Sequence, residues 1–312
     1  MLIVESGADP WVVRCEDAYL YCHVVDDASV HVRTSPTLEG LGTAEAVEVW
    51  RPPAHLQTLW APELHRLDGR WWIYVAADDG DNAQHRMHVL SADAPTGPYA
   101  YEGQITTEDD RWAIDGTVLE HEGSRYFVWS GWEHAHRTEE QRLYIARMSS
   151  PTTLVGPRVC IAVPSEPWEV AGFPVVEGPV AVQRSGRTSL LYAASHSLTD
   201  DYCLALLDLV GDDPLDPAAW RKQQRPVLAT SPGVCGPGHA SVVPDGDDGG
   251  WLVYHTHREP GSGWDRQVRM APYVWDADRG LVITPDEAVA PLLVQPHNAA
   301  ELYEDPGAEA VA

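Results

Sequence analysis

Short apolar runs separated by turn residues recur along the chain. In the clearest unit, an apolar run opens at Asp115, a Glu-Gly-Ser turn follows, and a second apolar run ends at Trp132. Four further units each open at a titratable residue, and the openings are separated by 54, 52, 62 and 62 residues. These four openings are Asp9, Glu63, Glu177 and His239. Such periods, with several short strands in each, are typical of propeller blades.

The pattern therefore predicts an all-β fold, a five-bladed β-propeller over residues 1–290, followed by a polar, acidic tail over 291–312. The first strand of each propeller blade lies innermost, and all inner strands run the same way along the central axis. Equivalent ends of these strands meet at one mouth of the channel. We therefore expect the five residues that open the units to converge there.

Composition narrows the class of partner. The 13 Trp and 12 Tyr stand against only 2 Phe, and aromatic side chains with a polar edge suit sugar binding as well as packing. A net charge of −26 argues against nucleic-acid binding, which requires an excess of Lys and Arg. The same charge would repel polyanionic polysaccharides, so a neutral oligosaccharide is the expected partner.

The cysteines and the first residues suggest a compartment. The five cysteines are odd in number and form no Cys-x-x-Cys pair, so we interpret them as buried free thiols rather than as disulfides or a zinc site. No basic segment followed by an apolar run opens the chain, and no run of about 18 apolar residues could span a membrane. We expect a cytoplasmic protein without a membrane partner; the sequence indicates no oligomeric state.

Three of the converging residues suit hydrolysis of a glycosidic bond. This reaction usually needs one carboxyl group to protonate the departing oxygen and another to activate water or to attack the sugar. We assign Asp9 as general base and Glu177 as general acid, since the longer side chain suits the group that must reach the leaving oxygen. Asp115 would raise the pKa of Glu177, because like charges resist joint ionisation, and would hold the sugar.

Nine separated motifs carry a family resemblance. In chain order they are Ala8-Asp9-Pro-Trp, Leu59-Trp-Ala-Pro-Glu63, Asn82-Ala-Gln-His-Arg-Met, Trp112-Ala-Ile-Asp-Gly-Thr, Val128-Trp-Ser-Gly-Trp132, Glu177-Gly-Pro, Tyr202-Cys-Leu, Gly236-Pro-Gly-His239 and Trp251-Leu-Val-Tyr-His255. Together they closely resemble glycoside hydrolase family 43 over about residues 7 to 285. The resemblance implies a five-bladed propeller, net inversion, and α-L-arabinofuranosidase or β-xylosidase activity. It also implies the same three roles for Asp9, Asp115 and Glu177.

The resemblance adds candidate binding residues. It implies a calcium or other cation on the channel axis near His239, with waters completing the shell because calcium prefers six to eight oxygens; the alternative is a His239 hydrogen-bonded to a channel acid. No organic cofactor is expected. An arginine of the last blade would contact the sugar, and we choose Arg266 over Arg269 because their three-residue spacing puts them on opposite faces of a strand. Trp60 and Trp132 are the predicted substrate-binding aromatics.

The expected function is that of an exo-acting, inverting α-L-arabinofuranosidase that releases terminal arabinose from α-1,5-linked arabino-oligosaccharides during arabinan degradation. A β-D-xylosidase would use the same chemistry on another pentose. A noncatalytic sugar-binding propeller, in which the acids are remnants, is the alternative from a different class.

Overall fold

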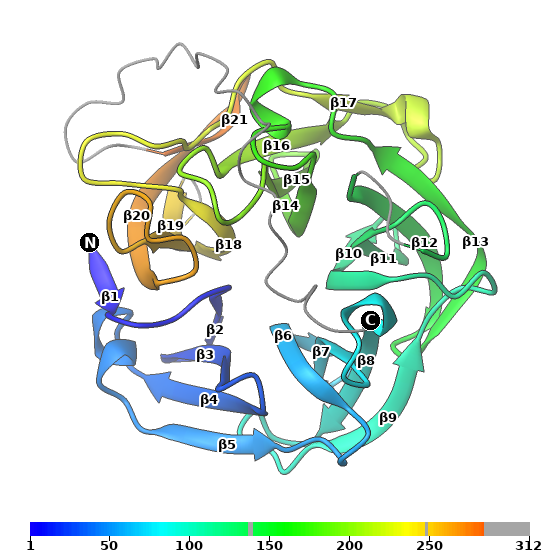
Figure 1. Ribbon diagram of the computed structural model, residues 1–312, viewed down its shortest axis with the longest axis vertical. Helices are drawn as coiled ribbons and strands as arrows, with labels where there is room; N and C mark the ends of the chain where they lie inside the picture. The colour runs from blue at the N-terminus through cyan, green and yellow to red at the C-terminus, as the bar shows by residue number, and fades with distance from the viewer. Residues whose placement is uncertain (137–139, 247–248, 284–312) are drawn as a thin grey trace, which may run out of the picture.

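The computed structural model describes residues 1–136, 140–246 and 249–283. Its strands form five antiparallel sheets arranged in a ring about a central axis (Figure 1). The prediction of an all-β, five-bladed propeller is confirmed. The predicted boundary at residue 290 and the tail over 291–312 lie outside the described residues.

Each blade is an antiparallel sheet whose first strand lies next to the axis. Blade 1 contains β2 (Trp11–Cys15), β3 (Ala18–Val25), β4 (Ser29–Ser35) and β5 (Ala46–Trp50). Blade 2 contains β6 (Gln57–Leu67), β7 (Arg70–Asp78), β8 (Arg86–Ala92) and β9 (Ala100–Ile105). Blade 3 contains β10 (Ala113–His121), β11 (Ser124–Gly131), β12 (Arg142–Ser150) and β13 (Thr153–Ala162). Blade 4 contains β14 (Val176–Arg184), β15 (Arg187–Ala194), β16 (Cys203–Leu209) and β17 (Trp220–Lys222).

The last blade is built from both ends of the described chain. It contains β18 (Gly238–Pro244), β19 (Gly249–His257), β20 (Arg266–Asp276), β21 (Gly280–Ile283) and the N-terminal strand β1 (Leu2–Val4). Both β1 and β21 pair with β20. Because β1 belongs to this sheet while β2 opens the next, hydrogen bonds from the first residues close the ring.

Short 3-10 turns occupy some connections. They are η1 (Glu39–Gly42), η2 (Asn82–Gln84), η3 (Pro167–Glu169) and η4 (Pro217–Ala219). No helix among the described residues is long and apolar enough to cross a membrane.

Buried apolar side chains hold neighbouring blades together. Between blades 2 and 3, Tyr74 packs against Phe127 with ring centroids 5.1 Å apart. Between blades 1 and 2, the indole nitrogen of Trp11 donates to the carbonyl of Leu64 at 2.8 Å. The polar edges of buried Trp and Tyr side chains are thus partly used to link blades, which fixes the inner strands relative to one another.

The inner strands share a backbone distortion at one end. Left-handed φ values occur at Asp9 (45°), Ala61 (44°), Asp115 (57°), Gly178 (54°) and His239 (35°). In β6, β10, β14 and β18 the pairing register shifts at this residue, as in a β-bulge. A bulge turns a side chain away from the regular alternation of a strand. This distortion aims side chains at the channel mouth.

Candidate active site

A pocket of about 630 Å³ opens where the distorted strand ends meet. Its lining includes Asp9, Asp115, Glu177 and His239, four of the five residues expected to converge. A volume of this size is typical of a small-molecule site. The pocket lies on the propeller axis, where titratable groups from blades 1, 3, 4 and 5 come together.

The expectation that Glu63 joins this mouth is wrong. In β6 the left-handed residue is Ala61, and Glu63 pairs with Tyr74 on the regular side of the bulge. Glu63 is buried, and its Oε2 lies 2.8 Å from His65 Nε2. The bulge moves Glu63 two residues along the strand from the position that Asp115 occupies in β10.

Asp9 is surrounded by nitrogen atoms. Its Oδ1 lies 3.3 Å from Arg266 Nη1, 3.2 Å from His255 Nδ1 and 3.5 Å from His239 Nδ1. Burial acts to raise the pKa of Asp9, but His239, the Arg266 charge and the contact with His255 outweigh it and lower that pKa. The Asp9 side chain keeps 23% of its surface exposed. An ionised, accessible carboxylate of this kind suits a general base.

Glu177 has the opposite electrostatic setting. Burial raises its pKa to about 7, the charge of Asp9 adds to this, and the hydrogen bond from Tyr202 and the charge of Arg266 oppose it. The Tyr202 hydroxyl donates to Glu177 Oε1 at 2.8 Å. A carboxyl group with a pKa near neutrality is protonated often enough to donate a proton.

Asp115 is held next to Glu177 by the backbone. Its Oδ2 accepts a hydrogen bond of 3.0 Å from the amide of Gly178, the residue after Glu177. Burial raises the pKa of Asp115 well above its ordinary value, and the charges of Glu177 and Asp9 add to this. The pocket therefore separates one ionised acid, Asp9, from two acids that retain protons to higher pH.

His239 lies between two of these acids. Its Nδ1 is 3.5 Å from Asp9 Oδ1 and 3.8 Å from Asp115 Oδ2, and burial lowers its pKa. In blade 2, Glu63 Oε1 is buried and has no hydrogen-bond partner among the described residues. One imidazole and a few carboxylate oxygens fit a calcium ion only if waters supply the remaining ligands.

The side chains of Arg266 and Arg269 lie on different sides of β20. Arg266 lines the pocket and contacts Asp9. Arg269 turns away and donates to the carbonyl of Gly233 at 2.6 Å. Because the residues are three positions apart on β20, their side chains leave opposite faces of the strand.

Both predicted aromatics line the pocket. Trp60 stacks on His85 with ring centroids 3.9 Å apart. Trp132 is buried and stacks on Trp112 with centroids 4.6 Å apart and planes 8° from parallel. These stacks fix the indole rings in place, so that any surface they offer to a sugar is rigid.

Several pocket residues received no role from the sequence. Tyr202 stands inside a motif, lines the pocket and donates to Glu177. His255 also stands inside a motif; it is buried outside the set of lining residues, and its Nδ1 accepts from the amide of Asp9. Asp27 and Trp264 come from connections that carry no motif. Trp264 is 61% exposed at the rim, and its indole nitrogen donates to Ser197 Oγ at 3.1 Å. The sequence does not show where the loop that carries Trp264 lies relative to the pocket, so the rim position of this tryptophan could not be predicted from it.

Comparison with known proteins decides the family. The profile of Glycosyl hydrolases family 43 matches residues 2–280. The chain belongs to glycosyl hydrolase family 43. The predicted family and the prediction of a glycoside hydrolase are therefore confirmed.

Family 43 relatives resemble the chain along most of its length. Alpha-L-arabinofuranosidase 43 of Humicola insolens is 34% identical over 91% of this chain and 62% of its own length. An extracellular exo-alpha-(1->5)-L-arabinofuranosidase of Streptomyces avermitilis is 32% identical over 96% of this chain and 66% of its own length. The chain thus spans about two thirds of the length of these relatives. The crystal structure of an alpha-L-arabinofuranosidase from Lactobacillus brevis superposes with a TM-score of 0.81 at 32% identity, covering 89% of this chain and 94% of that one.

The predicted cytoplasmic location is contradicted by these names, because the Streptomyces avermitilis relative is named an extracellular enzyme. A secretion signal is removed from a mature protein, so the first residues of a chain do not decide its compartment. The thiols were equally weak evidence. All five cysteines are free, as expected, but only Cys22 and Cys203 are buried.

Proposed function

We propose that this family 43 chain is an inverting, exo-acting α-L-arabinofuranosidase that removes terminal arabinofuranosyl residues from α-1,5-linked arabino-oligosaccharides. The observation that carries the proposal is the division of proton affinity in one aromatic pocket, where Asp9 is held ionised and the pKa of Glu177 is raised to about 7. The choice of arabinose follows the names of the relatives from Humicola insolens and Streptomyces avermitilis.

The chemistry follows from these proton affinities. Glu177 donates its proton to the glycosidic oxygen as the bond from that oxygen to the anomeric carbon breaks. Asp9 removes a proton from a water molecule, whose oxygen forms the new bond to the anomeric carbon. Attack from the face opposite the leaving group inverts the configuration. Asp9 ends protonated and Glu177 ionised, and proton exchange with solvent restores both.

The other pocket residues would bind the sugar and adjust the proton affinities of the acids. Arg266 would donate to sugar hydroxyls while holding Asp9 ionised, and Trp60 and Trp132 would pack against the sugar. Asp115 would modulate the acid, since its carboxylate is tied to the amide of Gly178. A neutral pentose-containing oligosaccharide also suits a chain with a net charge of −26.

The test compares two substrates side by side. Linear α-1,5-arabinotriose and xylobiose are incubated with the native chain and with Asp9→Asn, and the released pentose and its first-formed anomer are followed by NMR. Arabinose released from the arabinotriose only by the native chain, with inverted configuration, is the expected result. Release of xylose from xylobiose would instead support the alternative function, that of a β-D-xylosidase. Retained configuration would refute the roles of Asp9 and Glu177, and binding without any release would leave a sugar-binding propeller.

We further propose a calcium or similar cation on the axis beside His239, with waters as its remaining ligands. Such an ion would supply positive charge next to Asp9 and Asp115 and so favour their ionised forms. Metal content of the purified chain and of His239→Gln tests this directly. One calcium per native chain that is lost in the variant is expected; equal metal content in both would refute the site.

A further inference from the structure

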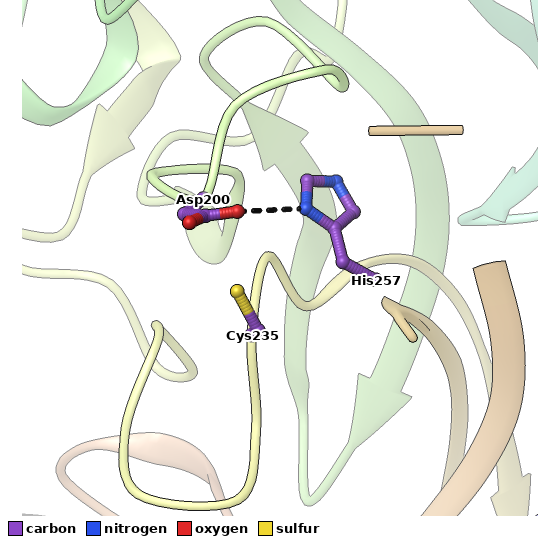
Figure 2. A group of neighbouring side chains, drawn as sticks. All are labelled: Asp200, Cys235 and His257. Atoms are coloured by element: carbon purple, nitrogen blue, oxygen red, sulfur yellow. Dashed lines mark hydrogen bonds and ion pairs between the residues drawn. The ribbon is translucent and has the colours of Figure 1, made fainter. Parts of the chain in front are cut away.

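Outside the catalytic pocket, three potential metal ligands from separate segments point toward one another (Figure 2). Asp200 lies in the connection between β15 and β16, Cys235 in the connection between β17 and β18, and His257 at the end of β19. Their ligand atoms all lie within 4.8 Å of one another. Zinc bond lengths of 2.0–2.3 Å place tetrahedral ligand atoms roughly 3.3–3.8 Å apart. A shift of about 1 Å by the most widely separated pair would therefore close the group around an ion.

The surroundings of His257 prepare one ring nitrogen to act as a ligand. The ring is buried, and its Nε2 lies 2.9 Å from the carbonyl oxygen of Ser197, which can only accept. This contact places a proton on Nε2 and leaves the Nδ1 lone pair toward Asp200. Metal-ligating histidines are usually oriented by such a carbonyl.

The other ring nitrogen faces an oxygen at close range. Nδ1 of His257 lies 3.0 Å from Asp200 Oδ1, as the dashed line in Figure 2 marks. If the His257 ring is neutral with its proton on Nε2, the lone pair of Nδ1 faces a lone pair of Asp200 Oδ1, and the two repel each other. The contact therefore needs either a second proton or a cation.

Neighbouring backbone atoms allow and support this arrangement. A side chain at Gly236 would place its Cβ 2.8 Å from the His257 ring, so that only glycine permits the approach. The amide of His257 donates to the carbonyl of Cys235 at 2.9 Å. The amide of Gly261 donates to Asp200 Oδ1 at 2.9 Å, which orients that carboxylate.

We propose that Asp200, Cys235 and His257 form a binding site for a zinc-class divalent cation. Thiolate, imidazole and carboxylate are the ligand types that zinc accepts, and three protein ligands leave a fourth position for water. The Asp200 side chain is 39% exposed, which gives an ion and a water access from solvent. On binding, the sulfur–metal bond of Cys235 replaces the sulfur–hydrogen bond, and one proton passes to solvent.

Such an ion would stabilise one side of the catalytic pocket. His257 Nε2 donates to the carbonyl oxygen of Ser197, and the Ser197 hydroxyl oxygen accepts a hydrogen bond from the Trp264 indole. Ser197 and Trp264 both line the pocket. The cation would thus cross-link two connections and the end of β19, and fix the rim that Ser197 and Trp264 form.

The test uses cobalt as a spectroscopic probe. The chain is reduced, stripped with a chelator and titrated with Co²⁺ while thiolate-to-cobalt charge-transfer absorption is recorded. One equivalent of Co²⁺ should produce the band, and Zn²⁺ should remove it by displacement. Cys235→Ser should abolish the band, Asp200→Asn should weaken Co²⁺ binding on the order of tenfold or more, and Cys160→Ser, which changes a partly exposed cysteine outside the group, should leave it intact.

Thermal melting provides a second measurement. Zn²⁺ should raise the melting temperature of the native chain and of Cys160→Ser, but not that of Cys235→Ser, whose folding is verified by near-UV circular dichroism. No charge-transfer band at excess Co²⁺, or the same band in Cys235→Ser, would overturn the proposal. The first result would leave Asp200 and His257 as an ion pair that shares a proton. Co²⁺ that binds without producing the charge-transfer band would occupy another site, such as the one proposed beside His239.

Discussion

The hydrogen bond from Tyr202 to Glu177 should determine where activity falls on the alkaline side. The Tyr202 hydroxyl lies 2.8 Å from Glu177 Oε1 and favours the carboxylate, against the burial that raises the pKa of Glu177 to about 7. A hydrogen bond to a charged group contributes about 1.5–3 kcal/mol, and one pKa unit corresponds to about 1.4 kcal/mol. Removal of the hydroxyl should therefore raise the pKa of Glu177 by about 1–2 units.

The substitution Tyr202→Phe removes the hydroxyl and keeps the ring, which stacks on His255 with centroids 5.6 Å apart. The assay is the pH dependence of kcat/KM on arabinotriose, which reports groups of the free enzyme. Glu177 must be protonated to act, so activity falls as pH rises through its pKa. The alkaline limb should move upward by about 1–2 units in the variant, while Asp9, whose pKa is lowered by His239, Arg266 and His255, should stay ionised across the profile.

Tyr192→Phe is the matched control. The Tyr192 hydroxyl also donates to a buried glutamate, Glu169 Oε1, at 2.8 Å, and neither residue lines the pocket. Its loss should leave the alkaline limb of the profile unchanged. An alkaline limb that stays in place or moves downward in Tyr202→Phe would refute the assignment of Glu177 as the acid, and so would an equal shift in the control.

Three further changes probe the same site. Gly178→Ala places a Cβ 3.1 Å from His239 Nδ1 at a backbone φ of 54°. Activity should therefore fall, and the free energy of unfolding measured in urea should drop by about 1–2 kcal/mol. The control Gly186→Ala changes a glycine with a φ of 78° that has open space around it, and it should keep activity. Because the pKa of Glu177 rises from 4.5 to about 7 on folding, its stabilising contribution is complete below about pH 4.5 and is lost as pH rises through 7. Glu177→Gln should therefore gain up to about 3 kcal/mol over the native chain between pH 4.5 and 8 in urea melts, and a gain that shrinks with pH would contradict this. Trp264→Ala should raise KM for arabinotriose roughly two- to tenfold with kcat nearly unchanged, because a rim aromatic contributes to binding; a loss confined to kcat would contradict that role.

Residues that repeat at equivalent places in the blades could be predicted from the sequence. The inner strands recur with a regular period, so the meeting of Asp9, Asp115, Glu177 and His239 in one pocket could be predicted from the sequence. The alternation of side chains along a strand was enough to predict that Arg266 and Arg269 leave opposite faces of β20. In both cases one local periodicity determines the position.

The prediction for Glu63 is wrong because the period of the strands does not reveal a β-bulge. A β-bulge inserts one residue without changing the apolar pattern around it, so the sequence does not show that Ala61 takes the left-handed position. The joining of Leu2–Val4 to the last blade is similarly hidden. A three-residue strand carries too little pattern to identify its partner.

Contacts made by connections were also beyond prediction. Tyr202 reaches Glu177 across 25 residues of sequence, and no spacing rule relates them. Cys235 has no neighbouring cysteine in the sequence, yet Asp200 from another connection and His257 from the end of β19 lie beside it. Such sites depend on loop paths, which the strand pattern leaves undetermined.

The left-handed residues connect the fold to the chemistry. A regular strand alternates its side chains between the two faces of its sheet, so a plain inner strand would direct Asp115 and His239 at neighbouring blades. The bulges turn them toward the axis instead, at a cost of roughly 1–2 kcal/mol for each residue that is not glycine. Packed blades and the hydrogen bond from Gly178 to Asp115 offset that cost. Strain at the channel mouth is therefore required for the acids to meet, and substitutions that relax it should stabilise the propeller while separating Asp115 and His239 from Asp9.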